Sequence, residues 1–467
     1  MVFSSLFFIY VFLALFFLAY FISPSTKLKN TVLIIFSLLF YAWGEPAYFG
    51  VLIISTIVNY LSGLLINKYR DKTGAKITIM ISLFINLGML TVFKYSGFII
   101  ENINNWFSLD IHVPDISLPI GISFYTFQAM SYTIDCYWDT VKVQKNYFKF
   151  LMYVSLFPQL VAGPIVRYSD IESEISNRKI NLVDISNGIT RITIGLAKKV
   201  IIANQLYPIV QSFFASDVEY VSVVGTWYAV ILYALYVYFD FSGYSDMAIG
   251  MGYMLGFHFN ENFNYPFICK DVTEFWQRWH ISLGSFFRDY LLYLPVFGKR
   301  RPTLNLFLVW FSTGIWHGAS WNFIFWGLYF GIFIFIERLI GKKRMKKIPL
   351  PVKHIYNKIV IIIGFGIFYF EDLGQLGIFF KNLIGLNGNK FIDETVKMSA
   401  TNNIFLIIIA ILACFPIKEI FKTKPDCGTF RLCFVNTTKI IYSVALLVIC
   451  SILLVDATSN PFLYFRF

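Results

Sequence analysis

The sequence predicts an all-α, polytopic transmembrane protein, and two observations support this prediction. Of 467 residues, 57% are hydrophobic and only 14% are charged, whereas soluble domains carry about a quarter charged residues. Residues 2–26 and 46–67 form long uncharged runs. Spanning the bilayer core takes roughly 20 apolar residues, and for runs of this length only a helix satisfies the backbone hydrogen bonds. We therefore expect one integral-membrane domain over residues 1–467.

Further apolar segments are expected to be membrane helices. They cover residues 77–93, 118–136, 151–165, 189–197 with 200–203, 221–238, 247–257, 304–315, 321–336, 359–370, 404–417 and 440–455. Many are short or are interrupted by Gly and Pro, which is typical of helices that pack against protein rather than lipid. We estimate about eleven crossings from a need of roughly 20 residues each.

The net charge of +12 arises from basic residues that lie in loops between apolar runs. The positive-inside rule accounts for this distribution, so we expect lipid rather than nucleic acid as the surrounding partner. The basic loop 68–76 is then cytoplasmic, which places the N-terminus and the loop 94–115 outside. Loops 299–301 and 342–347 are also strongly basic and are expected to be cytoplasmic. The six Cys show no metal-ligand spacing, so neither a metal site nor a disulfide framework is expected.

His317 is a candidate catalytic residue. It lies in the segment 311–321, FSTGIWHGASW, between two apolar runs whose outer loops are both basic. An even number of crossings must separate two cytoplasmic loops, so the runs are expected to form a helical hairpin or a pair of part-helices, with Gly314 and Gly318 allowing close backbone approach. An ionisable residue at such a break is costly and indicates function. The alternative is a structural His that is hydrogen-bonded to a neighbouring helix.

A second group of polar residues lies in the segment 271–290, DVTEFWQRWHISLGSFFRDY. On one continuous helix, Arg278, Ser282, Ser285 and Asp289 would share a face, whereas His280 would project elsewhere. Glu274 and Arg278 are spaced for an i,i+4 ion pair. These polar groups are either buried in protein, or belong to an amphipathic helix that lies at the membrane interface with aromatic anchors.

Asp240 and Asp246 lie at the end of an apolar run, in the segment YFDFSGYSDM. Acidic residues beside a membrane segment either line a polar cavity or cap helices. We include Asp240 among the candidate substrate-binding residues and leave both interpretations open.

Several kinds of chemistry lack their sequence motifs. There is no P-loop, no dinucleotide-binding glycine pattern, no HExxH and no GxSxG. What remains is histidine chemistry on a membrane scaffold: a neutral imidazole can take a proton from a hydroxyl while that hydroxyl attacks a thioester. Such a reaction needs no bound cofactor if the acyl group arrives already activated.

Several motifs, in order along nearly the whole chain, carry a family resemblance. They are FPQLVAGPI at 157–165, DFSGYSD at 240–246, FWQRWHISL at 275–283, FRDY at 287–290, WHGASWN at 316–322 and NPFLYFRF at 460–467. Together they resemble the membrane-bound O-acyltransferase (MBOAT) family, and within it the bacterial branch of membrane subunits for alginate and peptidoglycan O-acetylation.

This resemblance implies an architecture and an activity. The fold would be a ring of tilted helices around a central cavity in the bacterial cytoplasmic membrane. His317 matches the principal catalytic His of the family, and His280 matches the second His, whose role varies more. The acyl donor, which we expect to be acetyl-CoA, would enter from the cytoplasm. The acyl group would pass to an extracytoplasmic partner, typically an SGNH-type transferase, for O-acetylation of a cell-surface polysaccharide.

The remaining substrate-binding candidates lie around the two His motifs. Arg278, Trp316 and Asn322 belong to the motifs themselves, and Lys299, Arg300 and Arg301 lie between them in the sequence. At 296–301 the chain reads VFGKRR, where the branch usually has a Gly-Gly-Asn-Arg-like turn. The basic triplet is expected either to meet the phosphates of acetyl-CoA or only to set topology.

Three other functions compete with acetyl transfer. Within the family, the alternative is D-alanyl transfer to teichoic acid from a carrier protein. A proton-coupled transporter would use His317 and His280 as a proton relay, although the chain shows no repeated half with matching broken helices. A non-enzymatic assembly scaffold would use the same residues structurally.

Overall fold

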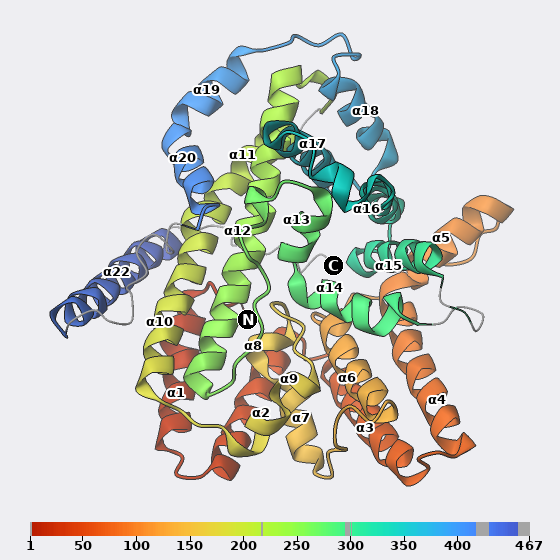
Figure 1. Ribbon diagram of the computed structural model, residues 1–467, viewed down its shortest axis with the longest axis vertical. Coiled ribbons are helices and arrows are strands. Elements are labelled where there is room, and N and C mark those ends of the chain that lie inside the picture. The colour runs from red at the N-terminus through yellow and green to blue at the C-terminus, as the bar shows by residue number, and fades with distance from the viewer. Residues whose placement is uncertain (1, 216–217, 295–298, 300, 417–428, 456–467) are drawn as a thin grey trace.

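The computed structural model describes residues 2–215, 218–294, 299, 301–416 and 429–455, with side chains of the last segment from 437 onward. The elements within these ranges are helical, as expected (Figure 1). The first half comprises η1 (Phe8–Phe12), α1 (Leu13–Ile22), α2 (Thr26–Gly44), α3 (Phe49–Lys68), α4 (Thr73–Leu90), η2 (Thr91–Tyr95), α5 (Ser96–Phe107), α6 (Ile122–Tyr137), α7 (Tyr147–Ser155), α8 (Phe157–Leu160), α9 (Tyr168–Asn177), α10 (Leu182–Ala197), η3 (Lys198–Ala203), α11 (Asn204–Phe214), η4 (Val218–Tyr220) and α12 (Val223–Leu255). The second half comprises η5 (Pro266–Ile268), α13 (Val272–Arg278), α14 (Ile281–Phe287), η6 (Arg288–Leu292), α15 (Pro302–His317), α16 (Trp321–Met345), α17 (Leu350–Tyr369), α18 (Leu373–Leu383), α19 (Glu394–Asn402), α20 (Ile404–Ala413) and α22 (Thr429–Val455).

Six helical stretches in the described part of the chain are long and apolar enough to cross a membrane. A seventh is added if α19 and α20, which are bent by 65° relative to each other, form one span. This number is lower than the estimate of about eleven crossings, which assumed roughly 20 residues each. Part of the difference arises because some of the expected segments form shorter helices: α6 has 16 residues, and the apolar helix Phe8–Ile22 is also too short for the candidate spans.

The helix α12 lies in the middle of the molecule, with α10 running beside it (Figure 1). Its most apolar window is 72% buried, against 17–39% for the other candidate spans. In this view the early helices α1–α4 and α6 lie in the lower part of the molecule and α16–α20 in the upper part, and α12 extends through both (Figure 1). An apolar helix in a membrane protein is covered either by lipid or by protein. The high burial of α12 shows that other helices cover it, so α12 forms the centre around which they are arranged.

The expected division of this region into spans 221–238 and 247–257 is wrong, because α12 is one helix of 33 residues. Cations on neighbouring segments neutralise its two carboxylates. Lys199 Nζ lies 2.5 Å from Asp240 Oδ1, and Lys198 Nζ lies 2.6 Å from Asp246 Oδ2. Both aspartates lie within α12 rather than at one of its ends. The interpretation of these residues as helix caps is therefore also wrong.

The expected hairpin is confirmed: α15 and α16 are antiparallel neighbours joined by a short turn after His317. Glycines set how closely they approach. A Cβ on Gly314 would lie 2.3 Å from the carbonyl oxygen of Phe323, and one on Gly327 would lie 2.3 Å from that of Trp310. Contacts this short are sterically impossible, so only glycine allows the two backbones to pack at this distance.

We expect Gly314→Ala to destabilise the protein, because the added methyl group forces the hairpin apart. Overpacking of this kind typically costs about 1–3 kcal/mol. The matched control is Gly88→Ala on α4, where an added Cβ meets nothing within 4 Å and the helix is expected to gain about 0.5–1 kcal/mol. Thermal unfolding in detergent should show a lower midpoint for Gly314→Ala only. Equal midpoints for the two variants would contradict this view of the hairpin.

Candidate active site

His317 is the last residue of α15, at the break that the sequence predicts. Its side chain is only 4% exposed. Its ring centroid lies 4.8 Å from that of Trp326, 5.2 Å from that of Phe368 and 5.0 Å from that of Trp316. These three aromatic rings come from α16, α17 and α15, so the imidazole is surrounded by the hairpin and the helix that follows it.

His280 lies between two short helices rather than within one. It adopts a left-handed backbone conformation with φ 45° and ψ 54°, which is uncommon for a residue with a side chain. The expected single helix over 271–290 is therefore wrong. The reason is non-local: the Asn262 carbonyl accepts from the Ile281 amide at 2.9 Å, and the Asn264 amide donates to the Arg278 carbonyl at 2.9 Å. A loop from elsewhere in the chain thus satisfies the backbone groups at the break.

Asn262 also fixes the His280 ring. The Asn262 side-chain nitrogen donates to Ser245 Oγ at 3.0 Å and to the Gly163 carbonyl at 3.3 Å, so its oxygen faces His280 Nδ1 at 3.0 Å. An amide oxygen only accepts, and a neutral imidazole carries one N–H and one lone pair. The hydrogen-bond pattern therefore assigns the proton to Nδ1 and the lone pair to Nε2. The sequence analysis missed Asn262 as a residue of the site. The one feature that could have indicated it was its position in a loop rich in Asn.

Trp316 brings the two histidines together. Its ring centroid lies 5.0 Å from that of His317 and 5.7 Å from that of His280. His280 is 2% exposed and Trp316 is 4% exposed. Two imidazoles from separate segments therefore contact one buried indole. This arrangement places both candidate histidines close enough to act on one substrate.

Lys94 reaches the same indole, with its Nζ 5.9 Å from the ring centroid. The expectation that residues 94–115 form an outer loop is wrong in its first part, because one helical stretch continues from Thr73 to Phe107. Sequence reasoning missed Lys94 as a site residue. In the sequence, Lys94 is a lone basic residue at the end of the apolar run 77–93. We had interpreted it as the first residue of a loop, so it was not considered as a site residue.

Two candidates from the motifs make structural contacts. Asn322 is fully buried on α16, where its side-chain nitrogen donates to the carbonyls of Ile367 at 3.2 Å and Phe368 at 3.4 Å. It thereby holds α17, which carries one wall of the His317 environment. Arg278 donates to Glu274 at 2.8 Å, which confirms the expected i,i+4 pair. A substrate contact for either residue stays a prediction.

Asp289, from the same segment, belongs to a separate ion-pair group. It lies 2.8 Å from Arg167 and 2.7 Å from Arg288. The hydrogen bond from Arg288 holds the pKa of the Asp289 carboxyl below its usual value, against the raising effect of partial burial. The pair with Arg167 connects η6 to the residue before α9.

The basic triplet is only partly described. Lys299 and Arg301 are exposed, and Arg300 lies outside the described residues. The C-terminal motif 460–467 also lies outside them. The donor-binding role of the triplet stays a prediction.

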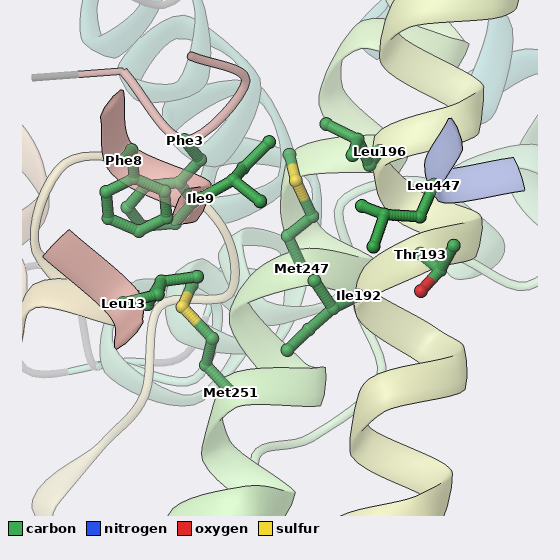
Figure 2. A pocket seen from close by; sticks show the side chains of 10 residues that line it. All are labelled: Phe3, Phe8, Ile9, Leu13, Ile192, Thr193, Leu196, Met247, Met251 and Leu447. Carbon is green, nitrogen blue, oxygen red and sulfur yellow. The ribbon is translucent and has the colours of Figure 1, made fainter. Parts of the chain in front are cut away.

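A small apolar cavity of about 30 Å³ lies elsewhere in the molecule (Figure 2). Residues from the start of the chain, α10, α12 and α22 line it, among them Phe3, Leu196, Met247 and Leu447. Thr193 supplies the single hydroxyl side chain among the residues that Figure 2 labels. None of the site residues contributes to this lining, so we assign the cavity to imperfect packing between helices.

A helical membrane fold with two buried histidines is compatible with a membrane enzyme that transfers acyl groups, and the comparisons with known proteins show this class. The model of the membrane-bound O-acyltransferase family matches residues 139–373, and the chain belongs to this family. It is 34% identical to a probable alginate O-acetylase of Azotobacter vinelandii, across the full length of both proteins. It is 31% identical to a peptidoglycan O-acetyltransferase of Helicobacter pylori over 83% of this chain and 80% of that protein. A teichoic acid D-alanyltransferase of Bacillus subtilis is 29% identical over 53% of this chain and 65% of that protein.

Because Asp240 is fully buried opposite Lys199, which is 2% exposed, we expect this ion pair to be needed for stability. Removing one partner of a buried pair leaves an uncompensated charge and typically costs about 3–5 kcal/mol. Asp240→Leu should therefore lower the thermal unfolding midpoint strongly, whereas the double variant Asp240→Leu/Lys199→Met should recover much of the loss. A double variant as unstable as Asp240→Leu would contradict the pairing.

Proposed function

We propose that this enzyme transfers acetyl groups from cytoplasmic acetyl-CoA toward an extracytoplasmic acceptor, for O-acetylation of a cell-surface polysaccharide. The observation that carries the proposal is the contact of His317 and His280 with the Trp316 indole at a buried helix end. Such a site excludes water, which would otherwise compete as acceptor, and it strengthens electrostatic interactions with the reacting groups.

His317 is the general base in this proposal. The acceptor oxygen forms a bond to the thioester carbonyl carbon while its proton moves to the imidazole. The tetrahedral intermediate then collapses, the C–S bond breaks, and the thiolate leaves with the proton that His317 returns. His280, held by Asn262 with its lone pair at Nε2, orients the acceptor or the acyl group. Acid–base catalysis of this kind needs one ring nitrogen that accepts and later gives back the proton.

The relatives support acetyl as the acyl group. The alginate and peptidoglycan O-acetylating relatives align with 80% or more of this chain, whereas the D-alanyltransferase aligns with 53%. D-alanyl transfer is the second candidate, supported by that alignment. In either case we expect the enzyme to reside in the bacterial cytoplasmic membrane and to work with an SGNH-type or similar partner. An adjacent gene for such a partner would support acetylation, and adjacent genes for a carrier protein and its ligase would support D-alanylation.

His317→Ala should nearly abolish acyl transfer while the protein still inserts, because a general base typically contributes about 10²–10⁴-fold. His280→Ala should lower the rate less severely. His112→Ala, the same substitution at an exposed position, serves as the matched control. The assay is ester formation from radiolabelled acetyl-CoA in inside-out vesicles of a deletion strain that is complemented with each variant. Near-normal transfer by well-inserted His317→Ala would refute the role of the base.

We also propose that Lys299, Arg300 and Arg301 bind the phosphates of acetyl-CoA. Neutralising Lys299 and Arg301 to Gln should then raise the apparent KM for acetyl-CoA, and added salt should mimic the effect. The matched control neutralises Lys343 and Lys346 in the other basic loop. It also removes two positive charges from a loop, and so affects the charge signal for membrane topology to the same extent. If KM is unchanged in correctly inserted protein, or rises equally in the control, the triplet does not bind the donor.

A further inference from the structure

Lys94 lies where a long membrane helix changes its winding. Between α4 and α5, residues Thr91–Tyr95 form the π-helical segment η2. Such segments widen the helix by one residue per turn and are frequent at functional sites. Here the widened turn carries Lys94 and Tyr95 toward the end of α15, where both side chains make specific contacts.

The two side chains bind successive backbone carbonyls. Lys94 Nζ donates to the Trp316 carbonyl, and Tyr95 Oη donates to the Ile315 carbonyl at 2.8 Å. The last four carbonyls of a helix have no partner within the helix, and the negative end of the helix dipole favours a cation there. Lys94 and Tyr95 thus complete the helix end that carries His317.

Lys94 retains hydrogen-bonding capacity beyond this contact. A lysine ammonium has three N–H donors, and the described acceptors are the Trp316 carbonyl and Ser123 Oγ, the latter at 3.3 Å. The Lys94 residue is also partly exposed, whereas His280 and His317 are buried. One ammonium hydrogen therefore remains for a ligand oxygen beside the indole that both histidines contact.

We propose that Lys94 is a catalytic residue that donates a hydrogen bond to the carbonyl oxygen of the acyl thioester. This inference rests on the proposed function and names a further residue of the same site. When the acceptor oxygen bonds to the carbonyl carbon, the π electrons of the C=O bond move onto its oxygen. The ammonium stabilises this negative charge until the C=O bond re-forms and the C–S bond breaks. Lys94 gives up no proton in the cycle, and His317 carries the proton from acceptor to thiolate.

A cation fits this role because the charge develops only in the transition state. A pre-placed donor in a site that excludes water then stabilises the transition state more than the bound thioester. Removing such a donor typically lowers kcat about 10²–10³-fold, and KM changes little because the hydrogen bond to the bound thioester is much weaker than the one formed in the transition state.

The competing account is that Lys94 only anchors the end of α15. Tyr95 provides the matched comparison, since it anchors the neighbouring carbonyl of the same helix end. Tyr95→Phe removes an anchor without removing a charge. Lys94→Gln removes the charge but keeps an N–H donor for the Trp316 carbonyl, and Lys94→Met removes both.

The experiment measures kcat and apparent KM for acetyl-CoA in the same vesicle assay, for the wild type, Lys94→Met, Lys94→Gln and Tyr95→Phe. Rates are normalised to inserted protein. We expect kcat to fall about 10²–10³-fold in Lys94→Met, to stay well below the wild type in Lys94→Gln, and to fall far less in Tyr95→Phe, with KM nearly constant throughout.

Three results would overturn the inference: normal kcat in Lys94→Met, recovery of normal kcat in Lys94→Gln, or an equal loss in Tyr95→Phe. If Lys94→Met does not insert, the comparison of Lys94→Gln with Tyr95→Phe decides. A wild type without turnover of acetyl-CoA would refute the proposed function and this inference with it. An active wild type with an inactive His317→Ala and a fully active Lys94→Met would refute the role of Lys94 alone.

Discussion

The close approach of α15 and α16 is the constraint on which the rest of the site depends. Because Gly314 and Gly327 face backbone carbonyls of the opposite helix, the two backbones pack in direct contact, and the turn between them is short. This packing ends α15 at His317 and leaves its last carbonyls without helical partners. Lys94 and Tyr95 satisfy two of them. The Trp316 indole is thereby held where His280 and His317 both contact it.

Buried polar contacts join this helix end to the second histidine. The carboxylate of Glu337 on α16 accepts from the first amides of α13, those of Val272 at 2.7 Å and Thr273 at 2.8 Å. A carboxylate at a helix N-terminus is favoured by the unpaired amides and by the helix dipole. Asn262 then fixes the break after α13 and the ring of His280. His317 is therefore positioned by the α15–α16 hairpin and His280 by the Asn262 loop, and such fixed placement suits a reaction that needs precise orientation.

The sequence predicted the features that depend on neighbouring residues and missed those that depend on distant ones. The hairpin and the buried His317 followed from two apolar runs around a Gly-containing break. The break at His280 did not, because amides and carbonyls near Asn262 replace the helical hydrogen bonds. The continuity of α12 was missed because the cation that neutralises Asp240 is Lys199, on another segment. Lys94 was assigned to a loop because the π-helical turn that carries it inward has no periodic apolar signal.

The central claim is that acyl transfer takes place beside the Trp316 indole, between His317 and Lys94. An experimental structure of the enzyme in a lipid nanodisc, with a ketone analogue of acetyl-CoA bound, tests this claim most directly. The account predicts the ketone carbon next to His317, with its oxygen within hydrogen-bonding distance of Lys94 Nζ, at about 2.7–3.2 Å. A ketone bound away from Trp316, or with its oxygen directed away from Lys94, would contradict the account.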